Sequence, residues 1–248
     1  AARARAAWEE ARAAGADLVA LPEMFLTGYQ TQDLVRKPAF VAHADRVLED
    51  LARACADGPA MGIGAPIFED GKLYNAYFVL QDGKIAAQVY KHHLPHDDVF
   101  DEYRLYTPGQ VSGPYRLGPL RIGTPICEDA WHEDVAETLA ETGAEILLVP
   151  NGSPYHRHKM GLRQSLMVSR VIETGLPLAY LNMVGGQDDQ VFDGGSFVLN
   201  PGGALAVQMP MLEEAVTHVE FTRTADGWVA EEGARAPIPD AWEQDYHV

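Results

Sequence analysis

Short apolar runs bounded by turn residues recur along the chain and predict a series of β-strands. Two of the predicted strands are separated by Gln81, Asp82, Gly83 and Lys84, which predict a hairpin turn. A second such turn is predicted at Pro201, Gly202 and Gly203. The predicted strands cover residues 18–21, 61–67, 76–80, 85–90, 120–127, 145–149, 178–182, 196–199, 204–208 and 215–221.

Between these runs, apolar or small residues recur at helical spacing and predict helices. Residues 1–18 carry charges throughout and predict an amphipathic helix instead of a signal peptide. Two further helices are predicted from Phe40, Val47, Leu48, Leu51 and Cys55, and from Leu162, Leu166, Ser169 and Ile172.

Strands that alternate with helices and also pair through hairpins favour mixed sheets with helices on their outer faces. The fold class we expect is α/β, a four-layer α-β-β-α sandwich. Such a domain usually opens with a strand, whereas this chain opens with a helix, so we expect the first strand to be lacking. A chain of 248 residues of this kind fits one domain.

The charge of the chain excludes several kinds of partner. Acidic residues outnumber basic ones by 36 to 19, and the net charge of -17 argues against a surface that binds nucleic acid or an anionic membrane. No apolar run approaches the roughly 18 residues needed to cross a bilayer. The two cysteines, Cys55 and Cys127, form no recognisable disulfide framework, so we expect a cytoplasmic protein.

Three residues with complementary chemistry stand at the ends of predicted strands: Glu23, Lys91 and Cys127. Each alone has an ordinary structural interpretation, as a carboxylate at a helix start, a solvated lysine and a buried cysteine. Together they would supply a base, a stabiliser of an oxyanion and a nucleophile, because a thiol becomes a strong nucleophile once its proton is removed. This combination indicates amide hydrolysis.

The surroundings of these residues carry a family resemblance. The motifs are LPE with LTGY, YKHHLP with FDEYRLYTPG, and IGTPICED followed by Trp131. They resemble the nitrilase or carbon-nitrogen hydrolase superfamily, and within it the glutaminase domains of glutamine-dependent NAD synthetases. The segments NGSPYHRHK and LNMVGGQDDQVFDGGSFVLNPGG support this narrower resemblance, which extends roughly from residue 6 to residue 247.

The resemblance implies a role for each residue. Glu23 is the expected general base, Lys91 the positive charge near the oxyanion, Cys127 the nucleophile and Glu102 a second glutamate that helps to position the site. The implied reaction is hydrolysis of the side-chain amide of L-glutamine through a thioester. The residues expected around the amino-acid end of glutamine are Tyr29, Glu128, Trp131, Ser153 and Lys159.

The resemblance also implies a division of the chain. Residues 1–224 are expected to form the hydrolase domain, and the acidic, Pro-rich residues 225–248 a connector towards an ATP-dependent synthetase domain. No SGGxDS loop of that domain occurs here. We therefore expect no cofactor or metal in this chain, ATP and Mg²⁺ in the synthetase domain of the same polypeptide, and a homo-oligomer.

Two positions depart from the family pattern. Asp97 stands where the family often has a tyrosine near the mouth of the site, and His158 stands where glycine is frequent. The first departure bears on how the pocket is gated, and the second on the shape of the loop around Ser153 and Lys159.

Other interpretations of the sequence are weaker. The main alternative is a free-standing amidase or nitrilase that acts on a small amide, nitrile or carbamoyl compound, and another is a non-catalytic scaffold. A phosphate loop at residues 185–196 lacks the Walker lysine and is more simply a turn between strands. A metal site would be unnecessary for the mechanism, and Pro95 interrupts its candidate ligands, which are His92, His93, His96, Asp97, Asp98 and Asp101.

Overall fold

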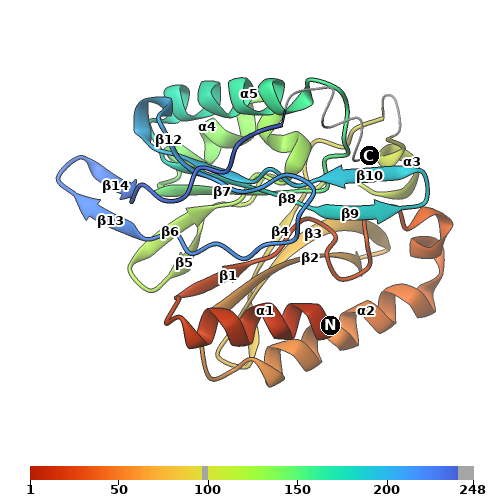
Figure 1. Cartoon of the computed structure of the whole chain (residues 1–248). Coiled ribbons are helices and arrows are strands. Elements are labelled where there is room, and N and C mark those ends of the chain that lie inside the picture. The colour runs from red at the N-terminus through yellow and green to blue at the C-terminus, as the bar shows by residue number, and fades with distance from the viewer. Residues whose placement is uncertain (97–99, 240–248) are drawn as a thin grey trace. The chain divides into compact units, whose positions relative to one another are not determined.

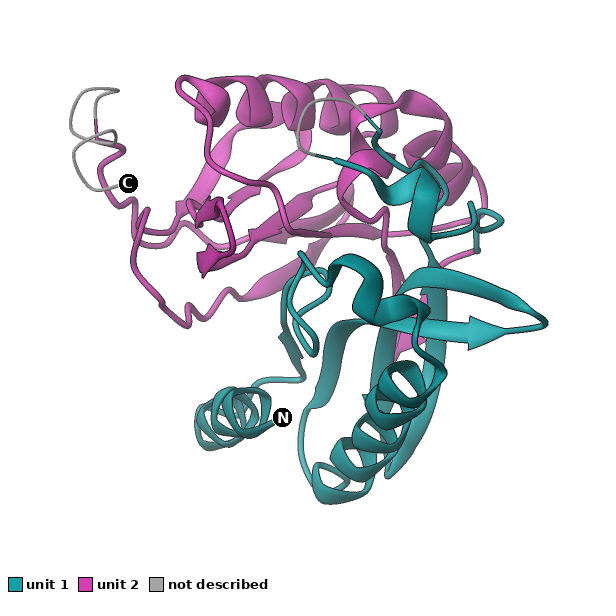
Figure 2. Ribbon diagram, turned by 90° about the vertical axis from the view of Figure 1, so that its right-hand side faces the viewer, with its two compact units in different colours: residues 1–112 teal, residues 113–248 magenta. Residues whose placement is uncertain are grey.

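The computed structural model describes residues 1–96 and 100–239 and divides the chain into two compact units, residues 1–112 and 113–248 (Figure 1, Figure 2). Asp97 and Asp98 lie outside the described residues. Each unit has a sheet and helices of its own, which confirms the α/β class expected from the sequence.

Unit 1 is built on a sheet with the strand order β1-β2-β3-β4. The first strand runs parallel to the second, and the remaining neighbours are antiparallel. The strands are β1 (Leu18–Ala20), β2 (Ala60–Glu69), β3 (Lys72–Gln81) and β4 (Lys84–Tyr90). The helices are α1 (Ala2–Ala13), η1 (Gln32–Arg36), α2 (Pro38–Ala54) and α3 (Glu102–Leu105).

The predicted turn between β3 and β4 is confirmed. Its two central residues, Asp82 and Gly83, have φ angles of 51° and 78°. Two successive positive φ values match the twist of an antiparallel hairpin, and Asp-Gly tolerates them well. The turn therefore fixes the register that carries Lys91 to the end of β4.

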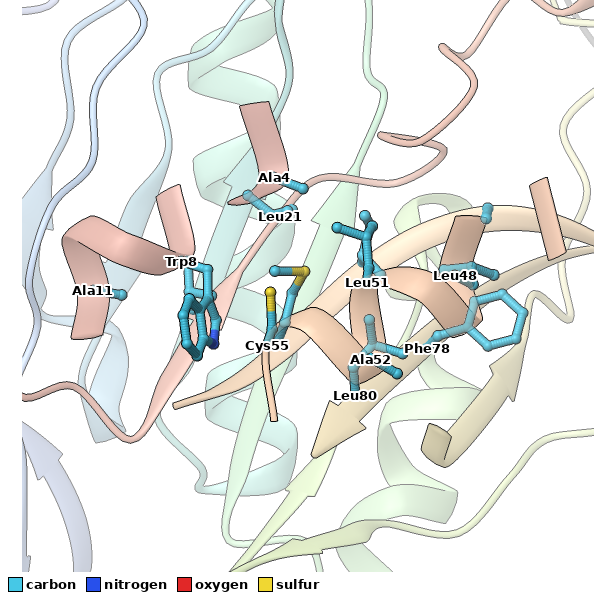
Figure 3. Close-up of a cluster of buried hydrophobic side chains, with 14 of the residues drawn as sticks. Ala4, Trp8, Ala11, Leu21, Leu48, Leu51, Ala52, Cys55, Phe78 and Leu80 are labelled. Carbon is cyan, nitrogen blue, oxygen red and sulfur yellow. The ribbon is translucent and has the colours of Figure 1, made fainter. Parts of the chain in front are cut away.

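Helices α1 and α2 cover one face of this sheet and bury an apolar core (Figure 1, Figure 3). Trp8 on α1, Leu48 on α2 and Phe78 on β3 are each at most 4% exposed. The Trp8 ring also donates a hydrogen bond from Nε1 to the Pro59 carbonyl at 2.8 Å. Burial of each such side chain stabilises the fold by roughly 1.5–3 kcal/mol.

Unit 2 is built on a six-stranded sheet with the order β12-β11-β8-β7-β6-β5. Its central strands β6, β7 and β8 are parallel, and the outer neighbours are antiparallel. Its strands are β5 (Tyr115–Leu117), β6 (Leu120–Gly123), β7 (Ile146–Asn151), β8 (Leu178–Asn182), β11 (Phe197–Leu199) and β12 (Leu205–Gln208). Its helices are η2 (Cys127–Trp131), α4 (Glu133–Glu141), α5 (Lys159–Thr174) and η3 (Pro201–Gly203).

Two hairpins complete unit 2: β9 (Val184–Gln187) with β10 (Gln190–Asp193), and β13 (Phe221–Thr224) with β14 (Gly227–Ala230). The first is the tight turn between strands that the sequence favoured over a phosphate loop. The second includes residues of the segment expected to be a connector. Further along that segment, the backbone of Arg235 forms an isolated parallel β-bridge with Gln208 of β12.

Two predicted strands are wrong in their extent. The strand expected at 120–127 ends at Gly123, since Pro125 cannot donate a ladder hydrogen bond, and Cys127 instead opens a 3₁₀ turn. The strand expected at 215–221 is irregular up to Glu220, and only Phe221 belongs to a strand. Val216 in this segment is 42% exposed, so its alternating pattern has no sheet to pack on.

The helix predicted around Leu162 and Ile172 exists as α5, but those two side chains are 49% and 60% exposed. The buried side of α5 includes Met160, Arg163 and Met167. An arginine can occupy that side because its guanidinium is fully paired, as described below. No helix within the described residues is long and apolar enough to span a membrane.

Candidate active site

Glu23 follows β1 in a tight turn that packs on the sheet of unit 1. Gly64 of β2 allows this approach, because a Cβ atom there would clash with the backbone of Glu23 and Met24. The Gly64 N–H donates to the Pro22 carbonyl at 3.3 Å, and the Leu26 N–H donates to the Gly64 carbonyl at 3.1 Å. These contacts hold Glu23 over the sheet, where it is 0% exposed.

Lys91 directly follows β4 and is also 0% exposed. Its backbone N–H donates to the Asn75 carbonyl at 2.9 Å, and its carbonyl accepts from the Gly109 N–H at 2.8 Å. Gly109 is required there because a Cβ atom would clash with the Tyr90 side chain. Hydrogen bonds of its backbone N–H and carbonyl therefore fix the backbone of Lys91, independently of the contacts of its side chain.

The side chains of unit 1 meet in a buried group that we call the carboxylate-lysine cluster: Glu23, Tyr29, Asn75, Lys91 and Glu102. Lys91 Nζ lies 2.8 Å from Glu23 Oε1 and 2.8 Å from Glu102 Oε1. Asn75 Nδ2 donates to Glu23 Oε1 at 2.8 Å, and the Tyr29 hydroxyl donates to Glu102 Oε1. Unit 1 thus brings together the four residues predicted within it.

Charge in the cluster is unbalanced, because two buried carboxylates share one ammonium group. The pKa of Glu102 is raised above its ordinary value by burial. The charge of Glu23 also raises this pKa, whereas the charge of Lys91 lowers it. Desolvation is the largest of these effects. Glu102 therefore takes up a proton more readily than an exposed glutamate.

The cluster borders a pocket within unit 1. Tyr29, Asn75 and Glu102 of the cluster line it, together with Met24, Gln30, Gln32, Phe100, Asp101, Arg104, Leu105 and Tyr106.

In unit 2, Cys127 is the first residue of η2 and has a φ angle of 49°. This left-handed conformation is uncommon for a residue other than glycine, and such strain concentrates at functional positions. The buried Asp129 side chain holds the turn by accepting the Ile126 N–H at 2.9 Å. The thiol is thereby placed at the N-terminal end of a helical turn, where backbone N–H groups lack partners within the turn.

Ser153 follows β7 and is fixed by a buried polar network. Asn182 on β8 accepts the Ser153 N–H at 3.0 Å and donates to the Ser153 carbonyl at 3.1 Å. Arg163 of α5 donates to Ser153 Oγ at 3.2 Å and to the Ser153 and Pro154 carbonyls at 2.9 and 3.0 Å. Its Nη1 lies 2.8 Å from Asp193 Oδ2, so this buried cation has a buried partner.

The remaining predicted residues lie around η2 and the start of α5. Lys159 is the first residue of α5, and its Nζ lies 5.8 Å from the centroid of the Trp131 ring. Glu128 is partly exposed, with Oε1 3.6 Å from His132 Nε2. His158 has a φ angle of 66°, which gives a physical reason for glycine at this position in the family pattern.

Sequence reasoning missed Asn75, Arg163, Asn182 and Asp193. Asn75 is a polar residue within the apolar strand KLYNAYFVLQ, and Arg163 interrupts the apolar side of α5. A charged or amide side chain at a position whose periodicity demands an apolar one is the signal that would have found them.

A comparison with protein families gives a match to the carbon-nitrogen hydrolase model over residues 1–227. The chain belongs to the carbon-nitrogen hydrolase family. Among curated relatives, it is 61% identical over 246 residues to the glutamine-dependent NAD(+) synthetase of Rhodobacter capsulatus, which covers 99% of this chain and 45% of the relative. The chain thus spans about half the length of the curated relatives it matches.

Solved structures show the same fold. The glutamine-dependent NAD⁺ synthetase of Acinetobacter baumannii matches with a TM-score of 0.91 and 30% identity, over 99% of this chain and 47% of that one. An amidase from Nesterenkonia sp. AN1 matches with a TM-score of 0.72 and 25% identity, over 83% of this chain and 77% of that one. That structure is of a mutant of the amidase and shows covalent addition of the acetamide moiety of fluoroacetamide at the active-site cysteine.

Proposed function

We propose that this chain hydrolyses the side-chain amide of L-glutamine to glutamate and ammonia. The observation that carries the proposal is the 61% identity to the Rhodobacter capsulatus synthetase across 99% of this chain. The carboxylate-lysine cluster and the strained turn at Cys127 supply the groups that the chemistry needs.

In the proposed reaction, Glu23 takes the proton of the Cys127 thiol, and the thiolate attacks the side-chain carbonyl carbon of glutamine. The carbon-oxygen double bond opens to an oxyanion, which Lys91 and the backbone N–H of Glu128 stabilise. One good donor to an oxyanion contributes roughly 3 kcal/mol to the stability of the transition state. Lys91 is suited to this role because its burial keeps water from competing for its charge.

Protonated Glu23 then returns the proton to the leaving nitrogen, the carbon-nitrogen bond breaks, and ammonia leaves a thioester on Cys127. Glu23 next removes a proton from water, whose oxygen attacks the thioester. Collapse of that intermediate releases glutamate and the Cys127 thiolate, which recovers the proton from Glu23. The cycle balances without an outside acid or base.

The amino-acid end of glutamine carries an ammonium and a carboxylate group, so its recognition needs an anion and a cation or donors. We assign Glu128 to the ammonium group and Lys159 to the carboxylate, with Ser153, Trp131 and Tyr29 around them. Lys159 stands at the N-terminal end of α5, where the helix dipole disfavours a cation unless an anion is also bound. A substrate carboxylate would supply that anion.

In the longer relatives, we propose that the ammonia serves ATP-dependent synthesis of NAD from deamido-NAD. ATP and Mg²⁺ then belong to a synthetase domain of the same polypeptide, with residues 1–224 as the hydrolase domain and residues 225–248 as a connector. A cytoplasmic homo-oligomer remains part of this proposal.

The test is release of ammonia and glutamate from L-glutamine by this chain, with asparagine, aliphatic amides and nitriles as parallel substrates. We expect selective turnover of glutamine and none in Cys127→Ala. Because this substitution removes only a sulfur, circular dichroism should show an unchanged fold. Turnover retained in Cys127→Ala would exclude the thioester.

A second candidate is a free-standing amidase, favoured by the match to the Nesterenkonia amidase over 83% of this chain and 77% of that one. Its natural substrates would be simple amides with no amino-acid end. Faster turnover of aliphatic amides than of glutamine in the same assay would select this function.

A further inference from the structure

Two glutamates contact one lysine in the carboxylate-lysine cluster, but their oxygens are not equally satisfied. Glu102 Oε1 accepts from both Lys91 Nζ and the Tyr29 hydroxyl. Glu102 Oε2 is buried and has no hydrogen-bond partner within the described residues. No side-chain oxygen of Glu23 is in that situation.

A buried carboxylate spreads its charge over both oxygens, so each oxygen needs a donor or water. Among the described residues, the surroundings of Glu102 provide two donors to Oε1 and none to Oε2. A neutral carboxylic acid fits this pattern better, because a buried hydroxyl without a partner costs less free energy than a buried share of a negative charge without a partner. In such an acid, Oε1, which has two donors, would be the carbonyl oxygen, and Oε2 would be the hydroxyl oxygen.

We infer that Glu102 carries a proton on Oε2 in the resting protein, so that Lys91 is shared between one carboxylate and one carboxylic acid. The cluster then holds one negative and one positive charge. Among the described residues, the titratable groups around Glu102 are Lys91, Glu23, Tyr29 and Tyr106, of which only Lys91 is a cation, and burial raises the pKa of Glu102. A second carboxylate charge would lie beside Glu23 with no further cation in the cluster.

The inference separates the roles of the two glutamates, and only this step rests on the proposed function. A carboxylic acid cannot accept the thiol proton, so Glu23 is the sole base and Glu102 orients Lys91 and Tyr29. Environments that give two neighbouring carboxyl groups different pKa values commonly divide the roles of acid and base between them.

The first test is infrared spectroscopy of the chain at pH 7, with and without ¹³C-labelled glutamate. A protonated carboxyl group has its own carbonyl stretch, and the label shifts it only if it belongs to glutamate. We expect a label-sensitive band that is lost in Glu102→Gln and in Glu102→Asp and kept in Glu145→Gln. Glu145 is a suitable control because it is 24% exposed and paired with Arg223.

The second test is the pH dependence of unfolding in wild type and Glu102→Gln. A carboxyl group with a raised folded pKa stabilises the fold below its unfolded pKa, and this stability is lost as pH rises towards the folded pKa. The amide introduced by Glu102→Gln cannot titrate, so the unfolding constant of wild type relative to the variant should rise about tenfold per pH unit between pH 5 and pH 7. The same ratio for Glu145→Gln should stay flat.

Absence of the labelled band, its persistence in both Glu102 variants, or a flat stability ratio would each overturn the inference. These outcomes are separate from the fate of the proposed function. If the band is absent and the protein still releases ammonia from glutamine, the inference of a proton on Glu102 is wrong and the glutaminase assignment stands.

Discussion

Each unit buries a group of charged residues, and the two groups differ in how completely they are satisfied. In unit 2, Arg163 pairs one to one with Asp193 and donates to three further oxygens around Ser153. In unit 1, Lys91 contacts two carboxyl groups, and buried oxygens of Glu102 and Asn75 have no partner within the described residues.

The difference teaches how buried charge is used. A fully satisfied network is rigid, and its removal damages the fold because it leaves an uncompensated charge. A cluster with unpaired polar atoms gives up stability but retains groups that can change protonation and contact a substrate. We therefore interpret the Arg163 network as a support for the loop at Ser153, and the carboxylate-lysine cluster as part of the chemistry.

The largest expected effect is on activity, in Glu23→Gln. The amide keeps the shape of the side chain but cannot take the thiol proton, so kcat should fall about 10²- to 10⁴-fold. Thermal unfolding should show that the variant is folded. Activity within a few-fold of wild type would mean that another group is the base and that the cluster is structural.

The next effect is on stability, in Arg163→Met. Methionine fills much of the space but leaves the buried Asp193 carboxylate without its cation, which should lower the free energy of unfolding by about 3–5 kcal/mol. Urea denaturation measures this loss. The double variant Arg163→Met with Asp193→Leu should recover part of it, whereas no loss in the single variant would remove the contrast between the two groups.

A smaller effect is expected from Asn75→Leu, which removes the donor to Glu23 Oε1 with little change of volume. Loss of a hydrogen bond to a charged group corresponds to about a ten- to hundred-fold lower kcat, with KM unchanged. Asn75→Asp provides the matched control, because it replaces the donor by a third carboxylate. Its activity relative to Asn75→Leu should rise as pH falls and the new carboxyl group takes up a proton.

The parts of this molecule that sequence predicted best are local. The hairpin at Asp82 and Gly83 follows from two residues that tolerate positive φ, and α2 follows from its apolar spacing. The motifs around Glu23, Lys91 and Cys127 indicated the family, which the match over residues 1–227 confirms.

The parts that sequence did not predict depend on partners far along the chain. Arg163 looks like a break in an apolar helix face until Asp193, thirty residues later, neutralises it. Asn75 reads as an irregular strand residue until the turn after β1 places Glu23 against it. The strand predicted at 120–127 ends at Gly123, before Pro125. The positive φ of Cys127 was not predictable from the residue type, because residues other than glycine seldom adopt it.

The smallest expected difference is between two buried tyrosines of unit 2. The Tyr115 hydroxyl accepts from Thr124 Oγ1 at 3.1 Å, whereas the Tyr180 hydroxyl has no hydrogen-bond partner of normal geometry within the described residues. Tyr115→Phe should lower the free energy of unfolding by about 1 kcal/mol, and Tyr180→Phe should leave it unchanged or slightly raise it. Equal losses in urea denaturation would contradict this ranking.

The most direct test of the central claim is covalent labelling with a glutamine analogue that carries a diazoketone in place of the side-chain amide. The chain contains only two cysteines, and Cys55 is an internal control because it is packed in the core of unit 1, where burial raises the pKa of its thiol. Peptide mapping should show one label on Cys127, blocked by excess L-glutamine and absent in Glu23→Gln. Labelling of Cys55, or labelling of Cys127 that glutamine does not block, would contradict a glutamine site built around Cys127.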